Sequence, residues 1–299
     1  MELWIPFTVA AASVQAARTA LQRHLKARLK TNSITFVRYF YGLPFALAFL
    51  AAVMGATGDR PPAPDTTFLL LCLGAGIAQI VATSLLILLF SYRNFAVGTT
   101  YSKTEVIQTA LFGLAFFGAA LSPRAFAGIL ISLAGVVVLS AVREKGGWRE
   151  LLLGWTSRAA GIGLASGACF AFAALFIREA AHTLPDSGFL FRAAFVLAVM
   201  VVMQTVLLGG YILWRTPGEY PLILRSWRTS GLAGFLSLAG SALWAIALTL
   251  ENAAHVRALG QVELILSLLI SHLIFRERTR ASEVLGMAVI VGGILLIVL

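Results

Sequence analysis

The 299-residue chain has few charged residues and very little cysteine, and each shortage excludes a class of protein. Charged residues make up 12% of the chain and hydrophobic residues 59%, whereas about a quarter of a soluble domain is charged. The two cysteines, Cys72 and Cys169, both lie inside apolar runs, so we expect neither a disulfide nor a metal pair. Walker, HExxH and GxSxG sequences are absent as well. We therefore expect an integral membrane protein that is not an enzyme and uses no cofactor or metal.

Long apolar stretches occupy most of the chain, and each is close to the roughly 20 residues that a membrane-spanning helix needs. Ten of them are found, at 3–22, 33–54, 67–90, 95–118, 123–142, 158–178, 187–214, 229–250, 256–275 and 281–299. The connectors between them are polar and too short to hold a soluble domain. The sequence therefore predicts an all-α membrane protein with ten transmembrane helices.

Positive charge is distributed unevenly over the connectors. Fifteen Lys and Arg residues follow the odd-numbered spans and four follow the even-numbered ones, counting residues at span ends. Cytoplasmic connectors carry the excess of Lys and Arg in membrane proteins. This predicts that both termini lie outside the cytoplasm, in what we expect to be a bacterial inner membrane. The net charge of +10 is explained by topology, so we expect a lipid bilayer and no nucleic acid as partner.

The chain repeats itself. A shift of 158 residues without a gap aligns Asn94 with Asn252 and Glu105 with Glu263, and both residue types are scarce here. The same shift aligns the glycine pairs Gly76/Gly234, Gly128/Gly286 and Gly135/Gly293, and a shift of 154 aligns Arg38 with Arg192. We infer two related halves of five spans each, 1–145 and 155–299.

An odd number of spans per half has a consequence for topology. The second half must cross the membrane in the opposite sense to the first, and the positive charges of its connectors agree. Inverted repeats of this kind build secondary transporters that bind a small-molecule substrate near the midplane and expose it to each side in turn. The repeat does not predict an oligomeric state, and a monomer is compatible with it.

Two five-span halves, an Arg early in the second span of each half, and the closing stretch "SHLIFRERTRASEVLGMAVIVGGILLIVL" resemble the EamA-type ten-helix exporters of the drug/metabolite transporter superfamily. The resemblance extends over the whole chain. It implies a central cavity lined by the first four helices of each half, with the fifth helix of each at the periphery. The family's Gly-Glu before the last helix is Arg276-Glu277 here, and the corresponding Glu position in the first half is Ala119.

The sequence "TTYSKTEVIQTALF" places Lys103 and Glu105 inside a predicted span, where a charge costs a few kcal/mol or more. On one straight helix these side chains would point about 200° apart. Glu105 would share a polar face with Tyr101 and Gln108. Lys103 is a candidate anchor for a substrate carboxylate, or alternatively the partner of a glutamate on a facing helix.

Glu263 is the counterpart of Glu105, and Gln261 is the counterpart of Lys103. Three interpretations of the two glutamates remain open. They are buried structural groups, or proton carriers whose protonation changes as the cavity opens to each side, or ligands for a substrate ammonium group.

Further polar or aromatic residues inside predicted spans are candidates for substrate binding. Arg38 and Arg192 lie near span ends and could instead extend their charged groups to the interface. Gln15 and Gln79 are placed deeper, where an amide binds a ligand or joins two helices. Trp244 lies deep in its span and either stacks on a substrate or packs against neighbouring helices.

The sequence thus predicts a secondary active transporter, and an exporter of small polar or zwitterionic metabolites such as amino acids. Proton coupling through Glu105 or Glu263 is part of this hypothesis. Efflux of drugs or organic cations is one alternative. A channel or a non-transporting scaffold is another.

Overall fold

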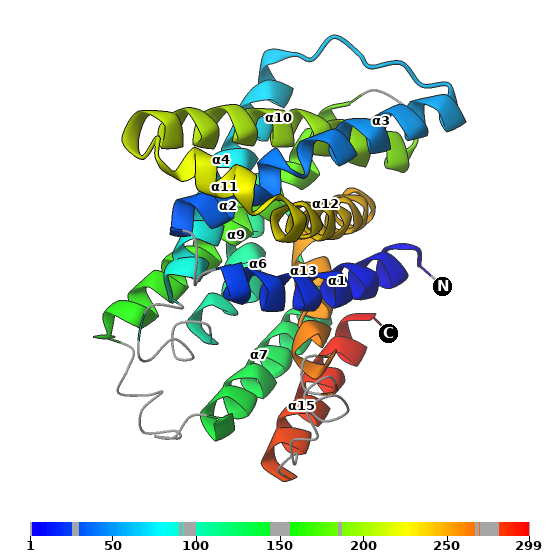
Figure 1. Ribbon diagram of the computed structural model, residues 1–299. Coiled ribbons are helices and arrows are strands. Elements are labelled where there is room, and N and C mark those ends of the chain that lie inside the picture. Colours follow the sequence, from blue (N-terminus) through cyan, green and yellow to red (C-terminus); the bar gives the residue numbers. More distant parts are fainter. Residues whose placement is uncertain are drawn as a thin grey trace. The chain divides into compact units, whose positions relative to one another are not determined.

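The computed structural model describes residues 2–25, 30–89, 92, 100–143, 156–184, 187–266, 269 and 281–298. The helices are α1 (Trp4–Leu25), α2 (Thr31–Phe40), α3 (Leu43–Thr57), α4 (Thr66–Leu89), α6 (Glu105–Phe117), α7 (Pro123–Arg143), α9 (Arg158–Thr183), α10 (Phe189–Arg215), α11 (Glu219–Arg225), α12 (Trp227–Leu250), α13 (Ala253–Leu259) and α15 (Ala281–Val298) (Figure 1). These ranges contain no strand, so the all-α class is confirmed for them. Asn94, the start of the predicted span 95–118 and much of 256–275 lie outside the described residues.

Several helices are long and apolar enough to cross a bilayer. Five such stretches are described: Thr31–Thr57, Thr66–Leu89, Arg158–Thr183, Phe189–Arg215 and Trp227–Leu250. Helices α7 and α15 contain shorter apolar stretches. Large apolar side chains are exposed along these helices, as a lipid-facing surface requires, and Val206 of α10 is 67% exposed. The protein is therefore an integral membrane protein, while the number of ten spans remains a prediction.

The described chain forms two compact units. Unit 1 comprises Met1–Ser84 and Ala173–Glu251, and unit 2 comprises Leu85–Phe172 and Asn252–Leu299. The boundaries fall inside α4, inside α9 and between α12 and α13. Each unit therefore combines segments from both predicted sequence halves.

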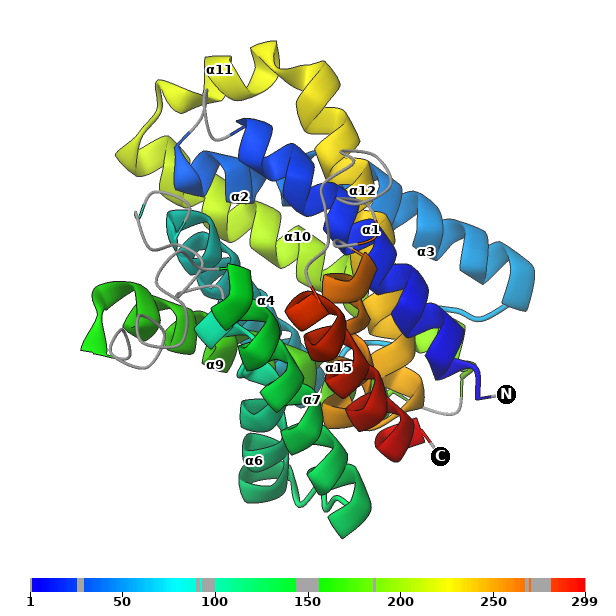
Figure 2. The same ribbon diagram turned by 90° about the horizontal axis from the view of Figure 1, so that it is seen from below.

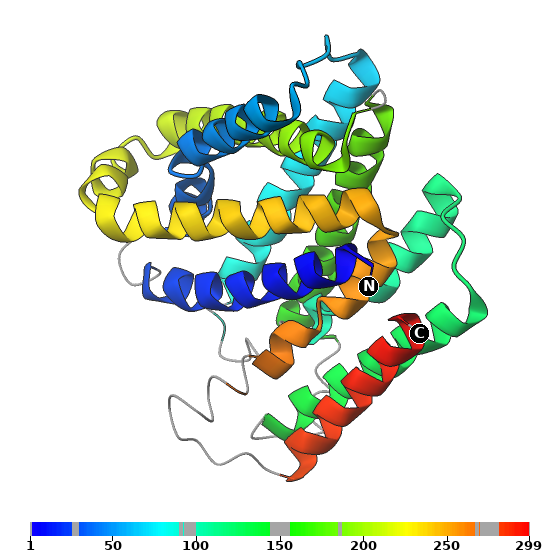
Figure 3. The same ribbon diagram turned by 90° about the vertical axis from the view of Figure 1, so that its right-hand side faces the viewer.

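In unit 1, helices from the two halves pack against one another. Helix α1 lies along α12, and α10 packs against both α2 and α3 (Figures 2 and 3). The Phe68 ring of α4 stacks on the Phe195 ring of α10 with 5.3 Å between centroids. Gly42 and Gly234 allow close approach, because a Cβ atom on Gly234 would lie 2.5 Å from the Cβ atom of Tyr41 and 2.9 Å from the backbone nitrogen of Gly42.

The predicted span 33–54 lies within the apolar stretch Thr31–Thr57, but a turn at Tyr41 and Gly42 divides it into two helices. Helix α2 ends at Phe40, and α3 begins at Leu43 after a short turn. The reason is Pro44 in the first turn of α3. Proline fits there because the first helical N–H groups have no intrahelical acceptor. In one continuous helix, Pro44 would lack the N–H that bonds to the Phe40 carbonyl, and its ring would clash with that carbonyl, so α2 ends at Phe40.

In unit 2, α7 and α15 lie side by side and run antiparallel (Figures 1 and 3). A Cβ atom on Gly128 would lie 2.7 Å from the Gly293 carbonyl oxygen, and one on Gly135 would lie 2.9 Å from the Gly286 carbonyl oxygen. The 158-residue shift converts the first contact into the second. The two fifth helices of the predicted halves thus pack about a local twofold axis, which is the relation that inverted repeats require.

The fourth predicted span is interrupted at a matching place in both halves. The Lys103 backbone N–H donates to the Thr100 carbonyl at 3.0 Å, and the Gln261 N–H donates to the Ala258 carbonyl at 3.1 Å. These i to i−3 bonds belong to the tighter 3₁₀ pattern, and the 158-residue shift superposes them. The straight helix assumed for Lys103 and Glu105 is therefore wrong, because α6 begins only at Glu105.

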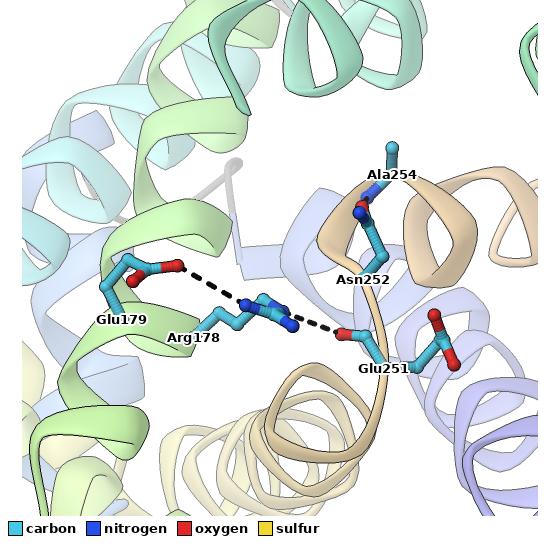
Figure 4. Close-up of polar contacts among 5 residues, drawn as sticks. All are labelled: Arg178, Glu179, Glu251, Asn252 and Ala254. Carbon is cyan, nitrogen blue, oxygen red and sulfur yellow. Dashed lines mark hydrogen bonds and ion pairs between the residues drawn. The ribbon is translucent and has the colours of Figure 1, made fainter. Parts of the chain in front are cut away.

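Helices α12 and α13 are separated by a break at Glu251 and Asn252 (Figure 4). In unit 1, Arg178 Nε donates to the Glu251 carbonyl oxygen at 3.1 Å, and this satisfies an acceptor just beyond the end of α12. In unit 2, Asn252 is the N-cap of α13, and its side-chain oxygen accepts from the Ala254 N–H at 2.9 Å. On each side of the break, a backbone group that lacks an intrahelical partner is thus hydrogen-bonded to a side chain.

Replacing this cap should weaken α13. We expect Asn252→Ala to lower the free energy of unfolding by about 1 kcal/mol, because the Ala254 N–H loses its acceptor. Asn252→Asp keeps an acceptor oxygen and is the matched control. Thermal unfolding of the purified variants in detergent measures the difference, and equal destabilisation by Ala and Asp would contradict the capping role.

Candidate substrate-binding site

A small cavity lies in unit 1, where α2, α4, α10 and α12 meet. It is lined by Arg38, Tyr39, Gln79, Val201, Gln204, Ser237, Leu238 and Ser241. It offers about 10 Å³ to the centres of water-sized molecules, which is room for about one water. Six of the eight lining residues carry polar side chains, although the helices that supply them are predominantly apolar. Polar groups converging in an apolar setting are typical of ligand sites.

Arg38 is the charged residue of this cavity. Its side chain is only 4% exposed, and Nη1 donates to Thr83 Oγ1 at 2.5 Å. The guanidinium carbon also lies 5.5 Å from the centre of the Tyr39 ring, a cation–π distance. The Nε atom is buried and has no hydrogen-bond partner in the described part of the chain. The expected extension of Arg38 to the interface is therefore wrong, because its charged group is enclosed by protein.

Gln204 of α10 is a second polar residue that lines the cavity. Its side chain is fully buried, and Nε2 donates to the Gly76 carbonyl at 3.2 Å and to Gln79 Oε1 at 2.9 Å. Gln204 Oε1 and Ser237 Oγ are buried without a partner among the residues that the structure describes. Buried polar atoms are nearly always hydrogen-bonded. Together with Arg38 Nε, they give the cavity three polar atoms available to a ligand.

The lining is related by the sequence repeat. The 158-residue shift superposes Gln79 on Ser237, and it superposes Thr83, the partner of Arg38, on Ser241. The third span of each predicted half therefore presents one polar residue at an equivalent position, Gln79 or Ser237, to the same cavity. Inverted-repeat transporters place their substrate where the halves meet.

The other predicted residues of unit 1 do not line this cavity. Trp244 Nε1 donates to Gln15 Oε1 at 3.0 Å, so these two residues connect α12 to α1. Arg192 lies in the first turn of α10 and is partly exposed. Its Nε is buried without a partner in the described ranges.

Charged residues gather at the helix break of unit 2. Lys103 Nζ lies 2.9 Å from Glu263 Oε2, and both side chains are mostly buried, at 19% and 12% exposed. Glu105 and Arg257 are close enough to interact electrostatically with the Lys103 ammonium group. The ion pair joins the fourth predicted spans of the two halves. Its charges balance, with two acids and two bases in the group.

The remaining predicted residues of unit 2 surround the same break. Gln108 Nε2 donates to Thr104 Oγ1 at 3.1 Å, while Gln108 Oε1 is buried without a partner among the described residues. Gln261 is 2% exposed, and its Oε1 has no described partner either. Tyr101 is partly exposed and accepts a hydrogen bond from Thr104 through its carbonyl oxygen.

The structure thus distributes the predicted residues over two places. Arg38 and Gln79 meet in the cavity of unit 1, whereas Lys103, Glu105 and Glu263 gather in unit 2. The list of candidates missed Gln204, Ser237 and Ser241. Gln204 could have been found, because it is one of few polar residues in the apolar stretch of α10.

No metal or redox site is seen in the described ranges. They contain no group of three or more His, Cys, Asp or Glu residues that could hold a metal ion. Both cysteines are free, and Cys72 is buried.

Long apolar helices, related halves and an enclosed polar cavity define the class of α-helical membrane proteins that carry solutes. A sequence profile described as "EamA-like transporter family" matches residues 2–141 and 157–299. The chain therefore belongs to the EamA-like transporter family, as the resemblance predicted. Members of this family are transporters and not enzymes, and the protein fits that class.

Comparison with solved structures supports the fold. A protein of known crystal structure superposes with a TM-score of 0.70 at 18% identity, covering 98% of this chain and 94% of that one. This similarity concerns the fold alone. Among curated proteins, no relative matches the chain.

Proposed function

We propose that the protein is a secondary active transporter that exports a small polar or zwitterionic metabolite, such as an amino acid, by alternating access. The observation that carries this proposal is the buried cavity in which Arg38 Nε, Gln204 Oε1 and Ser237 Oγ have no described partner. An unpartnered buried polar atom costs about 1–3 kcal/mol, and here three of them belong to residues that line one cavity. A site that binds a polar solute needs them.

Alternating access is supported by the repeat-related contacts. Gln79 and Ser237, which are equivalent in the two halves, both line the cavity, and the Gly128/Gly293 and Gly135/Gly286 contacts are equivalent as well. In inverted-repeat transporters, equivalent contacts of the two halves can adopt each other's conformation when one half moves against the other, and this opens the site to the opposite side of the membrane. The positive charges of the connectors support a bacterial inner membrane with both termini outside.

Glu105 and Glu263 are proposed as proton-coupling groups. Glu263 forms an ion pair with Lys103. Protonation of the Glu263 carboxylate would break this pair and release the Lys103 ammonium group, which would link proton binding to movement of the helices. Efflux of organic cations is the less favoured alternative, because the charged side chain that lines the cavity is itself a cation.

Reconstituted protein tests the transport proposal. In proteoliposomes loaded with unlabelled metabolite, we expect transient accumulation of labelled metabolite without any imposed gradient. Only a carrier gives this counterflow. When the binding site releases unlabelled cargo outside, it faces the labelled cargo there and carries a labelled molecule back inside. Liposomes without protein are the control. Downhill flux without counterflow would instead indicate a channel, and no flux with any of a panel of amino acids, organic acids and sugars would indicate a scaffold.

A further inference from the structure

The cavity of unit 1 carries an uncompensated positive charge. Arg38 is the one charged residue among its eight lining residues, and no ion pair joins it to a carboxylate in the described ranges. An enclosed cation inside a membrane-spanning protein is costly unless an anion accompanies it. A negatively charged ligand would remove this cost, whereas a neutral or cationic ligand would leave it.

The charged group of unit 2 lacks this property. Lys103 is paired with Glu263 at 2.9 Å, and Glu105 and Arg257 complete a balanced set. An anion that bound Lys103 would first have to displace a carboxylate. The anchor for an anion, predicted from the sequence at Lys103, is therefore better supplied by Arg38.

The three unpartnered atoms of the cavity also indicate which polar group the ligand carries beside its negative charge. Arg38 Nε carries a hydrogen and can only donate, while Gln204 Oε1 can only accept. Ser237 Oγ can do either. A ligand that satisfies all three must offer an acceptor for the guanidinium and a donor for the amide oxygen. A carboxylate with a neighbouring hydroxyl group has both and keeps a net negative charge.

We propose that the cavity binds a small carboxylate bearing a hydroxyl group next to the carboxylate, with Arg38 facing the carboxylate and Gln204 accepting from the adjacent hydroxyl. This inference rests on the proposed function and names the class of its cargo. The present room for about one water is too small for such a ligand, so the lining side chains and helices must move apart to admit it.

Binding to the purified wild-type protein tests the proposal with a matched series of small molecules. Lactate has both groups, propionate lacks the hydroxyl, and lactamide replaces the carboxylate by a neutral amide of the same shape. Longer 2-hydroxycarboxylates up to six carbons extend the series. By isothermal titration, we expect the hydroxycarboxylates to bind at least tenfold more tightly than their deoxy and amide analogues. Equal binding of a hydroxycarboxylate and its amide would overturn the proposal.

Variants connect this binding to the cavity. Arg38→Gln should weaken binding of the best hydroxycarboxylate by about ten- to a hundredfold, because a charge-assisted hydrogen bond is lost. Arg215→Gln, which changes an exposed arginine of the same unit, should leave it unchanged. Should Arg38→Gln fail to fold, Ser237→Ala and Gln204→Leu replace it, and they should abolish the preference for the hydroxyl group. Unaltered preference in those variants would contradict the proposed site.

Counterflow separates this inference from the proposed function. If another cargo exchanges while no hydroxycarboxylate binds, the anion site is refuted and the transporter stands. If these carboxylates bind in an Arg38-dependent manner but never exchange, the site stands and the transporter is refuted.

Discussion

Gly293→Leu is expected to disrupt the packing of α7 against α15 and to prevent stable folding of unit 2. Even the smaller change Gly293→Ala would place a methyl group against the Ser132 backbone nitrogen and 2.6 Å from the Gly128 carbonyl oxygen. Both obstacles are backbone, so no side chain can rotate out of the way. We expect Gly293→Ala to cost about 2–3 kcal/mol, with a larger loss for leucine.

The neighbouring residue provides the control. A Cβ atom on Gly292 would meet nothing within 4 Å, so Gly292→Ala should change stability by about 1 kcal/mol or less, in the stabilising direction that helix propensity favours. Thermal unfolding in detergent, with the yield of monodisperse protein, measures both variants. Equal stability of the two alanine variants would show that α7 and α15 are not in backbone contact.

Breaking the Lys103–Glu263 ion pair is expected to have the second large effect. Lys103→Gln, which copies the residue of the other half, leaves the Glu263 carboxylate without its ammonium partner. Removing one member of such a mostly buried pair should cost about 3 kcal/mol. For a chain of this size we expect the melting temperature to fall by about 6–12 °C.

Restoring the pair in reverse should recover stability. Lys103→Glu combined with Glu263→Lys keeps one charge of each sign, and the double-mutant cycle gives the coupling energy. If the cycle shows no coupling, the two side chains do not interact.

The same residues test proton coupling. In vesicles, Glu263→Gln should abolish gradient-driven uptake and retain counterflow if Glu263 carries the proton, and Glu105→Gln tests the other glutamate in the same way. Loss of substrate binding in either variant would point to a ligand role instead. Unchanged gradient-driven uptake in both would refute proton coupling through these glutamates.

The glycines show how much of the fold was readable from the chain. Aligning Gly128 with Gly286 and Gly135 with Gly293 needed only the repeat, because the shift is a property of the sequence. The alignment did not predict that Gly128 contacts Gly293 rather than its own counterpart. That choice depends on which faces of two antiparallel helices meet, and many small-residue faces were available.

The candidate site was predicted less completely. Scarcity of polar residues in apolar runs led to Arg38 and Gln79, both of which line the cavity. The same reasoning applied to Gln204 would have found a third residue. The partners of Lys103 could not be derived, because the straight-helix geometry assumed for it fails where the backbone switches to i to i−3 bonds. A single turn with i to i−3 bonds differs little in free energy from an α-helical turn. Packing, and not the local sequence, therefore decides where such a turn forms.

By itself, the amino-acid sequence determined that the protein lies in a membrane and that it consists of two related halves, and its scarce polar residues supplied the candidates for a functional site. Hydrophobicity and repetition are properties of residues in order along the chain, so they can be read without coordinates. Only the tertiary structure decided that Arg38 is buried with no carboxylate paired to it among the described residues, while Lys103 is paired with Glu263. Which charges find partners depends on distances between side chains far apart in the sequence, and those distances are set by helix packing.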